Sequence, residues 1–238
     1  MVHPHRRRPR AARQRGASLT EFIIVGPIAI LLTFVLLQAG LLYMAKLTLN
    51  NATFMAARHG SVNGAQASAI KNSLAKGLVP FYQNAFESSD ATRLAGAYAQ
   101  ALAAVNVGLN VKLSVLSPSE EAFRIYGITR AGVTTIPNDN LEFRTAAPIR
   151  GAGISLRDAN VLRIKVTYAY ELKVPLMQAI VKRIMCPLMT ADSDVRGWER
   201  PSLRPMGEVS DCVWYLQGRV PIVSYATVQM QTPPSRRG

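Results

Sequence analysis

The chain contains few of the residues on which most enzymes and metalloproteins depend. Its 238 residues include three histidines, two cysteines and two tryptophans. No CxxC pair and no Cys/His cluster is present, which argues against a zinc site. The sequence also lacks a GxSxG elbow, a Walker loop, a GxGxxG fingerprint and an HExxH motif. We therefore predict a protein that is not an enzyme and that needs no cofactor and no metal.

The remaining candidates for metal or acid–base chemistry are isolated. His3 and His5 lie close to the N-terminus, so a catalytic role would depend on His59 alone, and we interpret His59 as structural. Asp192-Ser193-Asp194 resembles part of a calcium loop, but the glycine and the distal glutamate of such a loop are missing. We interpret this motif as a solvated turn.

Acidic residues are scarce as well, with 14 against 28 basic residues and a formal net charge of +14. Such a chain can bind nucleic acid. However, six of the basic residues are arginines within the first fifteen positions, which leaves 22 basic residues against 14 acidic ones. The remaining positive charge is scattered and lacks a stripe of aromatic and basic residues. We therefore predict no nucleic-acid partner.

The two cysteines, Cys186 and Cys212, can pair if this part of the chain is exported. A bridge between them would close a loop of about 27 residues and stabilise the domain by about 3–4 kcal/mol in the chain-entropy model. The alternative is two buried thiols. Trp198 and Trp214 flank Cys212, and we interpret them as packing residues, with a cover for the disulfide or a contact surface as alternatives.

Residues 22–45 form an uncharged run that predicts a membrane-spanning helix. As a helix the run is about 36 Å long, enough for a hydrocarbon layer of about 30 Å with some tilt, and it exceeds the apolar core of a secretory signal. The arginine cluster places the N-terminus in the cytoplasm, and Lys46 marks the far interface. Pro27 predicts a slight kink. Gln38 either bonds a neighbouring helix or lies near the interface.

The junction before this run is the most informative stretch. A basic leader ends at Gly16, and five residues later Glu21 stands at the edge of the apolar run, where an unpaired carboxylate is costly. The pattern Gly-x-x-x-x-Glu-Phe resembles the prepilin peptidase signal of type IV pilins. The resemblance implies cleavage between Gly16 and Ala17 and a role for Glu21 and Phe22 in subunit assembly. Glu21 would meet the new N-terminal amine of a neighbouring subunit, whose pKa is about 8.

A closer resemblance covers about residues 13–64. The stretch RGASLTEF (15–22), the early Pro27 and the stretch LNNATFMAARHG (49–60) are similar to TadE-like proteins of the tight-adherence (Flp) pilus system. Residues 221–231 look like the closing strand of that family, whereas residues 85–160 match no pattern of it. The resemblance implies a pseudopilin of the bacterial inner membrane that takes part in assembling a Tad pilus for adhesion. Its implied partners are the prepilin peptidase, the Flp pilin, other pseudopilins, the inner-membrane platform and the lipid bilayer.

Three alternatives remain at this point. The first is an uncleaved signal-anchored envelope protein whose periplasmic domain binds a ligand or a partner. The second is a membrane-tethered enzyme, for which no residues are evident. The third is a minor pseudopilin of type II secretion, against which the alanine-rich segment after the helix argues.

The predicted fold is α+β: a long N-terminal transmembrane helix, then an extracytoplasmic domain with an antiparallel sheet and packed helices, as in a pilin-like lollipop. The domain boundaries are a cleaved leader (1–16), the membrane and extended helix (17–60), the α+β domain (61–231) and a basic tail (232–238). Beyond the membrane, a stripe of small apolar residues is expected on the first helix, formed by Leu42, Ala45, Leu49, Ala52 and Ala56.

Patterns of period and capping place the remaining elements. Helices are expected at 66–76 (ending at Gly77), at 91–106 after a Ser88-Ser89-Asp90 cap, at 175–185, and briefly up to Tyr126 after a cap at Ser117-Pro118. Strands are expected at 109–115, 161–171 and 221–231. Residues 127–160 are expected to be loop with short strands, and residues 186–219 to be rich in loops.

Overall fold

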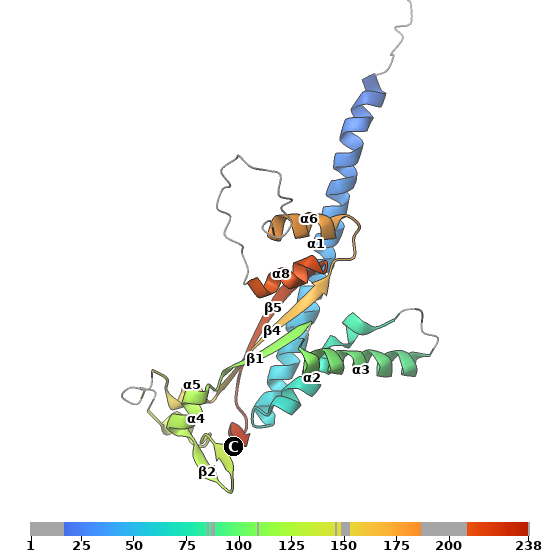
Figure 1. Ribbon diagram of the computed structural model, residues 1–238. Coiled ribbons are helices and arrows are strands. Elements are labelled where there is room, and N and C mark those ends of the chain that lie inside the picture. The colour runs from blue at the N-terminus through green and yellow to red at the C-terminus, as the bar shows by residue number, and fades with distance from the viewer. Residues whose placement is uncertain are drawn as a thin grey trace, which may run out of the picture.

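The computed structural model describes residues 17–84, 86, 89–108, 110–145, 147–148, 153–186 and 209–237 (Figure 1). The N-terminal part of helix α1 (Ala17–Val62) projects out of an α+β domain, and its C-terminal part lies within that domain. This layout confirms the predicted fold class. The predicted leader, the motif at 192–194 and Trp198 lie outside the described residues.

The main sheet is antiparallel, with the strand order β1-β4-β5. Its strands are β1 (Val111–Ser117), β4 (Val161–Glu171) and β5 (Arg219–Gln229). Strand β4 has the predicted bounds, because its alternating apolar residues form one buried face. The other two strands are shifted by about two residues from their predicted positions.

Helices cover the buried face of this sheet. Helix α2 (Ala67–Tyr82) and helix α3 (Asp90–Val107) pack with the inner part of α1 against it. Ser89 precedes α3 as predicted, but its side chain makes no capping hydrogen bond. The shared core includes residues of all three helices and of the sheet: Leu49, Ala52, Ile70, Leu74, Leu78, Ala101, Val111, Leu162, Ile164, Val166, Ala226 and Met230.

The prediction that the second helix ends at Gly77 is wrong. Helix α2 continues through Gly77 and Pro80 to Tyr82. Gly77 lies where α2 crosses α1, and a Cβ built on it would lie 2.6 Å from both the Cα and the Cβ of Ala52. The glycine therefore permits close contact between two helices, and the burial of Leu78 and Val79 on the same helix carries α2 past it.

A second, smaller antiparallel sheet lies at the end of the molecule opposite the projecting helix (Figure 1). Its strands are β2 (Ile128–Arg130), β3 (Val133–Thr135) and β6 (Ser235–Arg237). Beside it lie α4 (Glu120–Tyr126), the 3-10 helix η1 (Leu141–Phe143) and α5 (Leu156–Ala159). The short strands in 127–160 were expected, but the tail from 232 was not expected to form a strand. It does so because β6 pairs with β3 and because the Ser235 amide donates to the Gly64 carbonyl at 2.9 Å.

The cap of α4 also differs from the prediction. Ser119, not Ser117, is the N-cap residue, and its Oγ accepts a hydrogen bond from the Ala122 amide at 3.2 Å. Pro118 therefore precedes the helix and does not occupy its first position. One serine precedes Pro118 and one follows it. Only the backbone conformation shows which of the two caps the first turn of the helix.

Two short helices lie near the point where α1 enters the domain. Helix α6 (Met177–Met185) was predicted, whereas α8 (Val209–Leu216) lies in a stretch predicted to be rich in loops. A disulfide joins Cys186, just after α6, to Cys212 within α8, with the two Cα atoms 5.9 Å apart. The bridge therefore holds two helices together that are separated by more than twenty residues in the chain.

Candidate assembly site along helix α1

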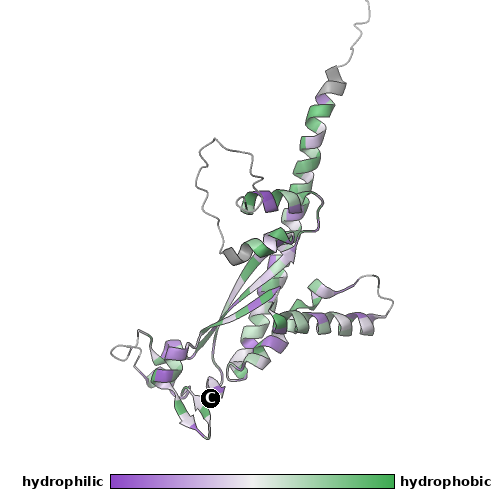
Figure 2. Cartoon of the chain, in the orientation of Figure 1, coloured by the Kyte–Doolittle hydropathy of each residue, from purple (hydrophilic) through white to green (hydrophobic). Residues whose placement is uncertain are grey.

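Most of the first half of α1 is not covered by the rest of the described chain. In residues 21–37, called here the projecting half, no side chain is buried. Figure 2 shows that this half consists mostly of hydrophobic residues. The helix has the length and composition to cross a membrane, and it is the one such helix among the described residues. An apolar surface that faces outward all round the helix is typical of a membrane anchor.

Glu21 and Phe22 lie at the free end of the projecting half. Phe22 is 75% exposed, and Glu21 is exposed too. No ion pair in the described part of the chain involves Glu21. At 1.5 Å per residue, Glu21 is about 26 Å along the helix from Gln38, the first buried residue of α1. The basic groups among the described residues of the domain therefore lie far from this carboxylate.

The predicted cleavage site borders this end. Ala17 is the first residue of α1, and Gly16 lies outside the described residues. From Ala17 onward, the start of α1 points away from the domain (Figure 1).

The second half of α1 has the opposite surroundings. In residues 45–62, called here the packed half, the predicted stripe is confirmed: Ala45, Leu49, Ala52 and Ala56 are buried, and Leu42 is half-buried. The small side chains allow α2 and the sheet to approach the helix backbone closely. A Cβ built on Gly60 would lie 2.6 Å from an Ile70 atom and 2.9 Å from a Leu162 atom. The alanine-rich segment therefore forms a close-packed helix contact.

Gln38 links the two halves to the domain in a way that sequence reasoning did not foresee. Its side chain is only 4% exposed, and its Oε1 accepts a hydrogen bond from the Val174 amide at 3.0 Å. Its Nε2 has no partner among the described residues. Val174 lies in the turn between β4 and α6. A lone polar residue inside an apolar run was the available signal, but the run gave no indication of a partner 136 positions away.

Lys46, predicted to mark the far interface, also contacts the domain. Its Nζ donates to the carbonyl oxygen of Val223 in β5. Gln38 and Lys46 are two helical turns apart on α1, and both bond to the main chain of the domain. These polar contacts therefore hold the domain to α1 at the point where the side chains of α1 change from exposed to buried.

Titratable groups with shifted pKa values lie away from Glu21. Burial raises the pKa of the Tyr168 phenol, which stacks on Phe81 with ring centroids 4.6 Å apart. The ammonium of Lys173, 2.9 Å from Glu171, lowers the pKa of that carboxyl. Within the described ranges, no three His, Cys, Asp or Glu side chains gather as metal ligands.

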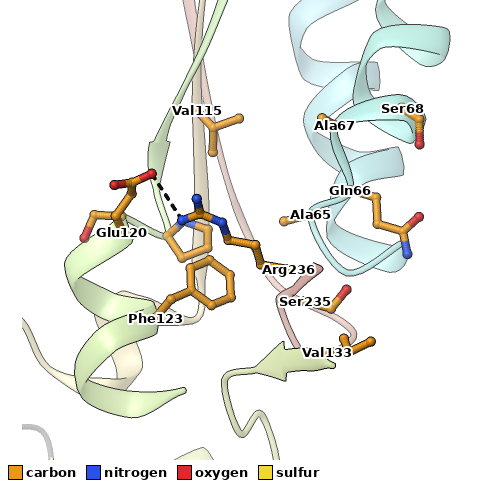
Figure 3. A pocket seen from close by; sticks show the side chains of 12 residues that line it. Ala65, Gln66, Ala67, Ser68, Val115, Glu120, Phe123, Val133, Ser235 and Arg236 are labelled. Atoms are coloured by element: carbon orange, nitrogen blue, oxygen red, sulfur yellow. Dashed lines mark ion pairs between the residues drawn. The ribbon is translucent and has the colours of Figure 1, made fainter. Parts of the chain in front are cut away.

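One open cavity of about 690 Å³ lies beside the second sheet. Figure 3 shows Arg236 of β6 directed at Glu120 of α4, with which it forms an ion pair at 3.1 Å, and Phe123 close by. Both charged side chains are largely exposed. The walls come from the α1–α2 turn, β1, α4, β3 and β6, so no contiguous sequence motif predicts the cavity.

These features define a class: a protein with one apolar helical anchor, an unpaired acid at the start of the anchor and an α+β domain packed on the helix's second half. Residues 16–58 match the family model described as TadE-like protein. The match confirms, for this segment, the resemblance inferred from the sequence, and it spans Glu21, the whole projecting half and most of the packed half. Neither a curated protein nor a solved structure matches the chain.

Proposed function

We propose that the protein is a minor pseudopilin that takes part in assembling a Tad (Flp) pilus for surface adhesion. The observation that supports this function best is Glu21, an exposed and unpaired carboxylate at the start of an apolar helix in the TadE-like segment. A carboxylate at the edge of a bilayer needs a partner. The described residues of the domain do not supply one, which supports a partner from another molecule or from the processed N-terminus.

Cleavage after Gly16 would supply that partner. It removes the six arginines of the leader and gives Ala17 a free amine, whose pKa of about 8 keeps it mostly protonated at neutral pH. In a partly desolvated site an ammonium and a carboxylate attract each other more strongly than in water. The proposed assembly step therefore pairs Glu21 of one subunit with the amine of a neighbour, while Phe22 and the other exposed apolar residues pack between helices.

The proposed location follows from charge and redox chemistry. The arginine cluster favours a cytoplasmic N-terminus in the inner membrane, with the domain on the periplasmic or extracellular side. The disulfide between Cys186 and Cys212 suits an oxidising compartment. The proposed partners are the prepilin peptidase, the Flp pilin, other pseudopilins and the inner-membrane platform, and the protein's own role is structural.

Processing is tested by the intact mass of the membrane form, isolated with and without the pilus prepilin peptidase. We expect loss of residues 1–16 only when the peptidase is present. Gly16→Ala should prevent the loss. Gly26→Ala is the matched control, because that glycine lies within α1 and its added Cβ would meet only the flexible Phe22 ring at 3.7 Å. A full-length chain under both conditions would support the uncleaved signal anchor instead.

Assembly is tested separately with Glu21→Gln. This variant keeps the size of the side chain and removes its charge, so we expect normal cleavage, a normally folded domain and a strong loss of surface pili. Glu142→Gln, on an exposed residue of η1, is the control and should assemble like the original chain. Normal piliation by Glu21→Gln would show that the carboxylate has no role in assembly.

A further inference from the structure

Helix α6 contacts α1 at a depth that is informative once α1 is placed in a bilayer. Phe34 and Leu42 of α1 pack against the cluster of Leu172, Val174 and Met177 at the start of α6. Measured along the helix from Glu21, these two contacts lie at about 20 Å and about 32 Å. The hydrocarbon layer is about 30 Å thick. With Glu21 at one boundary of the layer, the cluster at the start of α6 therefore packs on the last third of the span and reaches the other boundary.

The position of α6 is fixed by several bonds. The Val174 amide donates to Gln38 of α1, and the Gln178 side chain donates to the Leu172 carbonyl at 2.9 Å. The Leu172 amide donates in turn to the Gly218 carbonyl at 3.1 Å. At its other end the disulfide from Cys186 ties α6 to α8. The helix is therefore held at this depth from both ends.

The direction and composition of α6 suit a membrane surface. Figure 1 shows α6 lying across α1, so it runs along the membrane plane when α1 crosses the bilayer. Leu176 at its start is 63% exposed and Ile184 near its end is 67% exposed. Lys182 and Arg183 are basic, and residues 172–186 contain no acid. The acid that precedes this stretch in the sequence, Glu171, is paired with Lys173.

We propose that α6 lies in the headgroup layer of the bilayer that α1 crosses, with Leu176 and Ile184 inserted at the acyl boundary and Lys182 and Arg183 bound to the phosphates of anionic phospholipids. Short amphipathic helices with basic and apolar side chains bind membranes in this way. Two observations select lipid over a protein partner: the surface is continuous with the anchor helix, and its charge has one sign. The proposal requires that α1 spans a bilayer, but it does not require cleavage or pilus assembly.

The experiment uses the full chain in lipid nanodiscs, with a photo-crosslinking p-benzoylphenylalanine at one position at a time. The test position is 184. Position 35 in the projecting half serves as the lipid-exposed reference, and position 128 in β2, whose Ile128 is 47% exposed, serves as the control far from the membrane. We expect lipid adducts at 35 and 184 and none at 128. Adding phosphatidylglycerol to phosphatidylcholine nanodiscs should raise the adducts at 184 several-fold and leave those at 35 unchanged.

Lys182→Gln/Arg183→Gln tests the charge contribution in the same chain. Both side chains are at least partly exposed, so the variant is expected to fold, which circular dichroism checks. It should abolish the increase at position 184 with phosphatidylglycerol. Adducts at 184 no more frequent than at 128, or crosslinks at 184 only to a second protein chain, would overturn the proposal. A full response to phosphatidylglycerol without the two basic residues would overturn the assigned headgroup contact.

Discussion

The two halves of helix α1 belong to one continuous helix and have opposite surfaces. In the projecting half the exposed side chains are large, including Phe22, Ile28 and Leu36, and none is buried. In the packed half the buried residues are small, four alanines with Thr53, Gly60 and Ser61, and Leu49 is the one large residue among them. The average apolar character of the helix conceals this difference. Side-chain size, more than hydrophobicity, separates the exposed part of the helix from the part that holds the domain.

The most direct test of this comparison replaces one leucine in each half. Leu49 is fully buried and Leu37 is mostly exposed, so the same change meets two environments. Leu49→Ala should lower the free energy of unfolding of the domain by about 3–5 kcal/mol, because it leaves a cavity between α1, α2 and the sheet. Leu37→Ala should change it by less than about 0.5 kcal/mol. Denaturant unfolding in detergent micelles, followed by circular dichroism, measures both. Equal effects would show that the two halves do not differ as described.

A second test adds one methyl group where the packed half meets α2. Gly77→Ala should destabilise the domain by about 1–3 kcal/mol, because its Cβ would lie 2.6 Å from the Ala52 backbone and the gain in helix propensity does not offset that overlap. Gly96→Ala in α3 is the matched control, since nothing lies within 4 Å of its added Cβ. It should stabilise the domain by about 0.5–1 kcal/mol. Thermal unfolding of the two variants should therefore shift in opposite directions.

A third test concerns Gln38, at the boundary between the halves. Gln38→Ala removes the acceptor for the buried Val174 amide, which should cost about 1–2 kcal/mol. The same loss should raise the hydrogen-exchange rate of the Val174 amide about tenfold or more. Gln100→Ala, on an exposed residue of α3, is the control and should leave both quantities unchanged. An unchanged exchange rate in Gln38→Ala would mean that this bond does not hold the domain to α1.

The smallest expected effect lies far from α1, in the capping box of α5. The Ser155 hydroxyl and amide donate to the Asp158 carboxylate at 2.7 and 3.1 Å and lower its pKa. A lowered pKa in the folded state gives stability that is fully present above the ordinary value of about 4 and is lost as the pH falls through the folded-state pKa. Ser155→Ala should cost about 1 kcal/mol at pH 7 and flatten this loss between pH 5 and pH 2.

Urea midpoints across that range measure the effect, with Ser68→Ala on an exposed serine as the control. A pH profile in Ser155→Ala that matches the original chain would exclude the hydroxyl as the cause of the shift. A loss of stability in Ser155→Ala as large as that in Leu49→Ala would contradict the comparison of the two halves of α1. It would mean that the region of the second sheet contributes as much stability as the packing around α1.

The sequence predicted the parts of the molecule whose patterns are long and local. The apolar run, the alanine stripe and the alternation in β4 each repeat over ten or more residues, and their bounds agree closely with α1 and β4. Glu21 could be recognised in the sequence because burying an unpaired carboxylate in a membrane costs free energy whatever the fold of the domain. The candidate site on α1 was therefore largely accessible without coordinates.

The remaining features depend on contacts between distant residues. Glycine is common at the C-terminal ends of helices, so Gly77 suggested that the helix ends there. Only its contact with Ala52 shows that this glycine instead allows two helices to pack closely. Ser235 to Arg237 are polar, and they form β6 because β3 offers an unpaired edge. Gln38 bonds a turn near residue 174, and no local pattern connects the two positions. Single-residue signals of this kind have several meanings, and tertiary packing selects among them.

The strand that completes the domain has a consequence for biogenesis. Strand β5 follows every other element of the main core in the chain, yet its Ala226 and the adjacent Met230 pack in the same core as Leu49 and Ala52, and Val223 receives the bond from Lys46. Until this segment has been synthesised and has paired with β4, the alanine surface of α1 lacks part of its cover. The domain can therefore close only after the last strand has arrived, and a polypeptide truncated before β5 would leave that helix surface exposed.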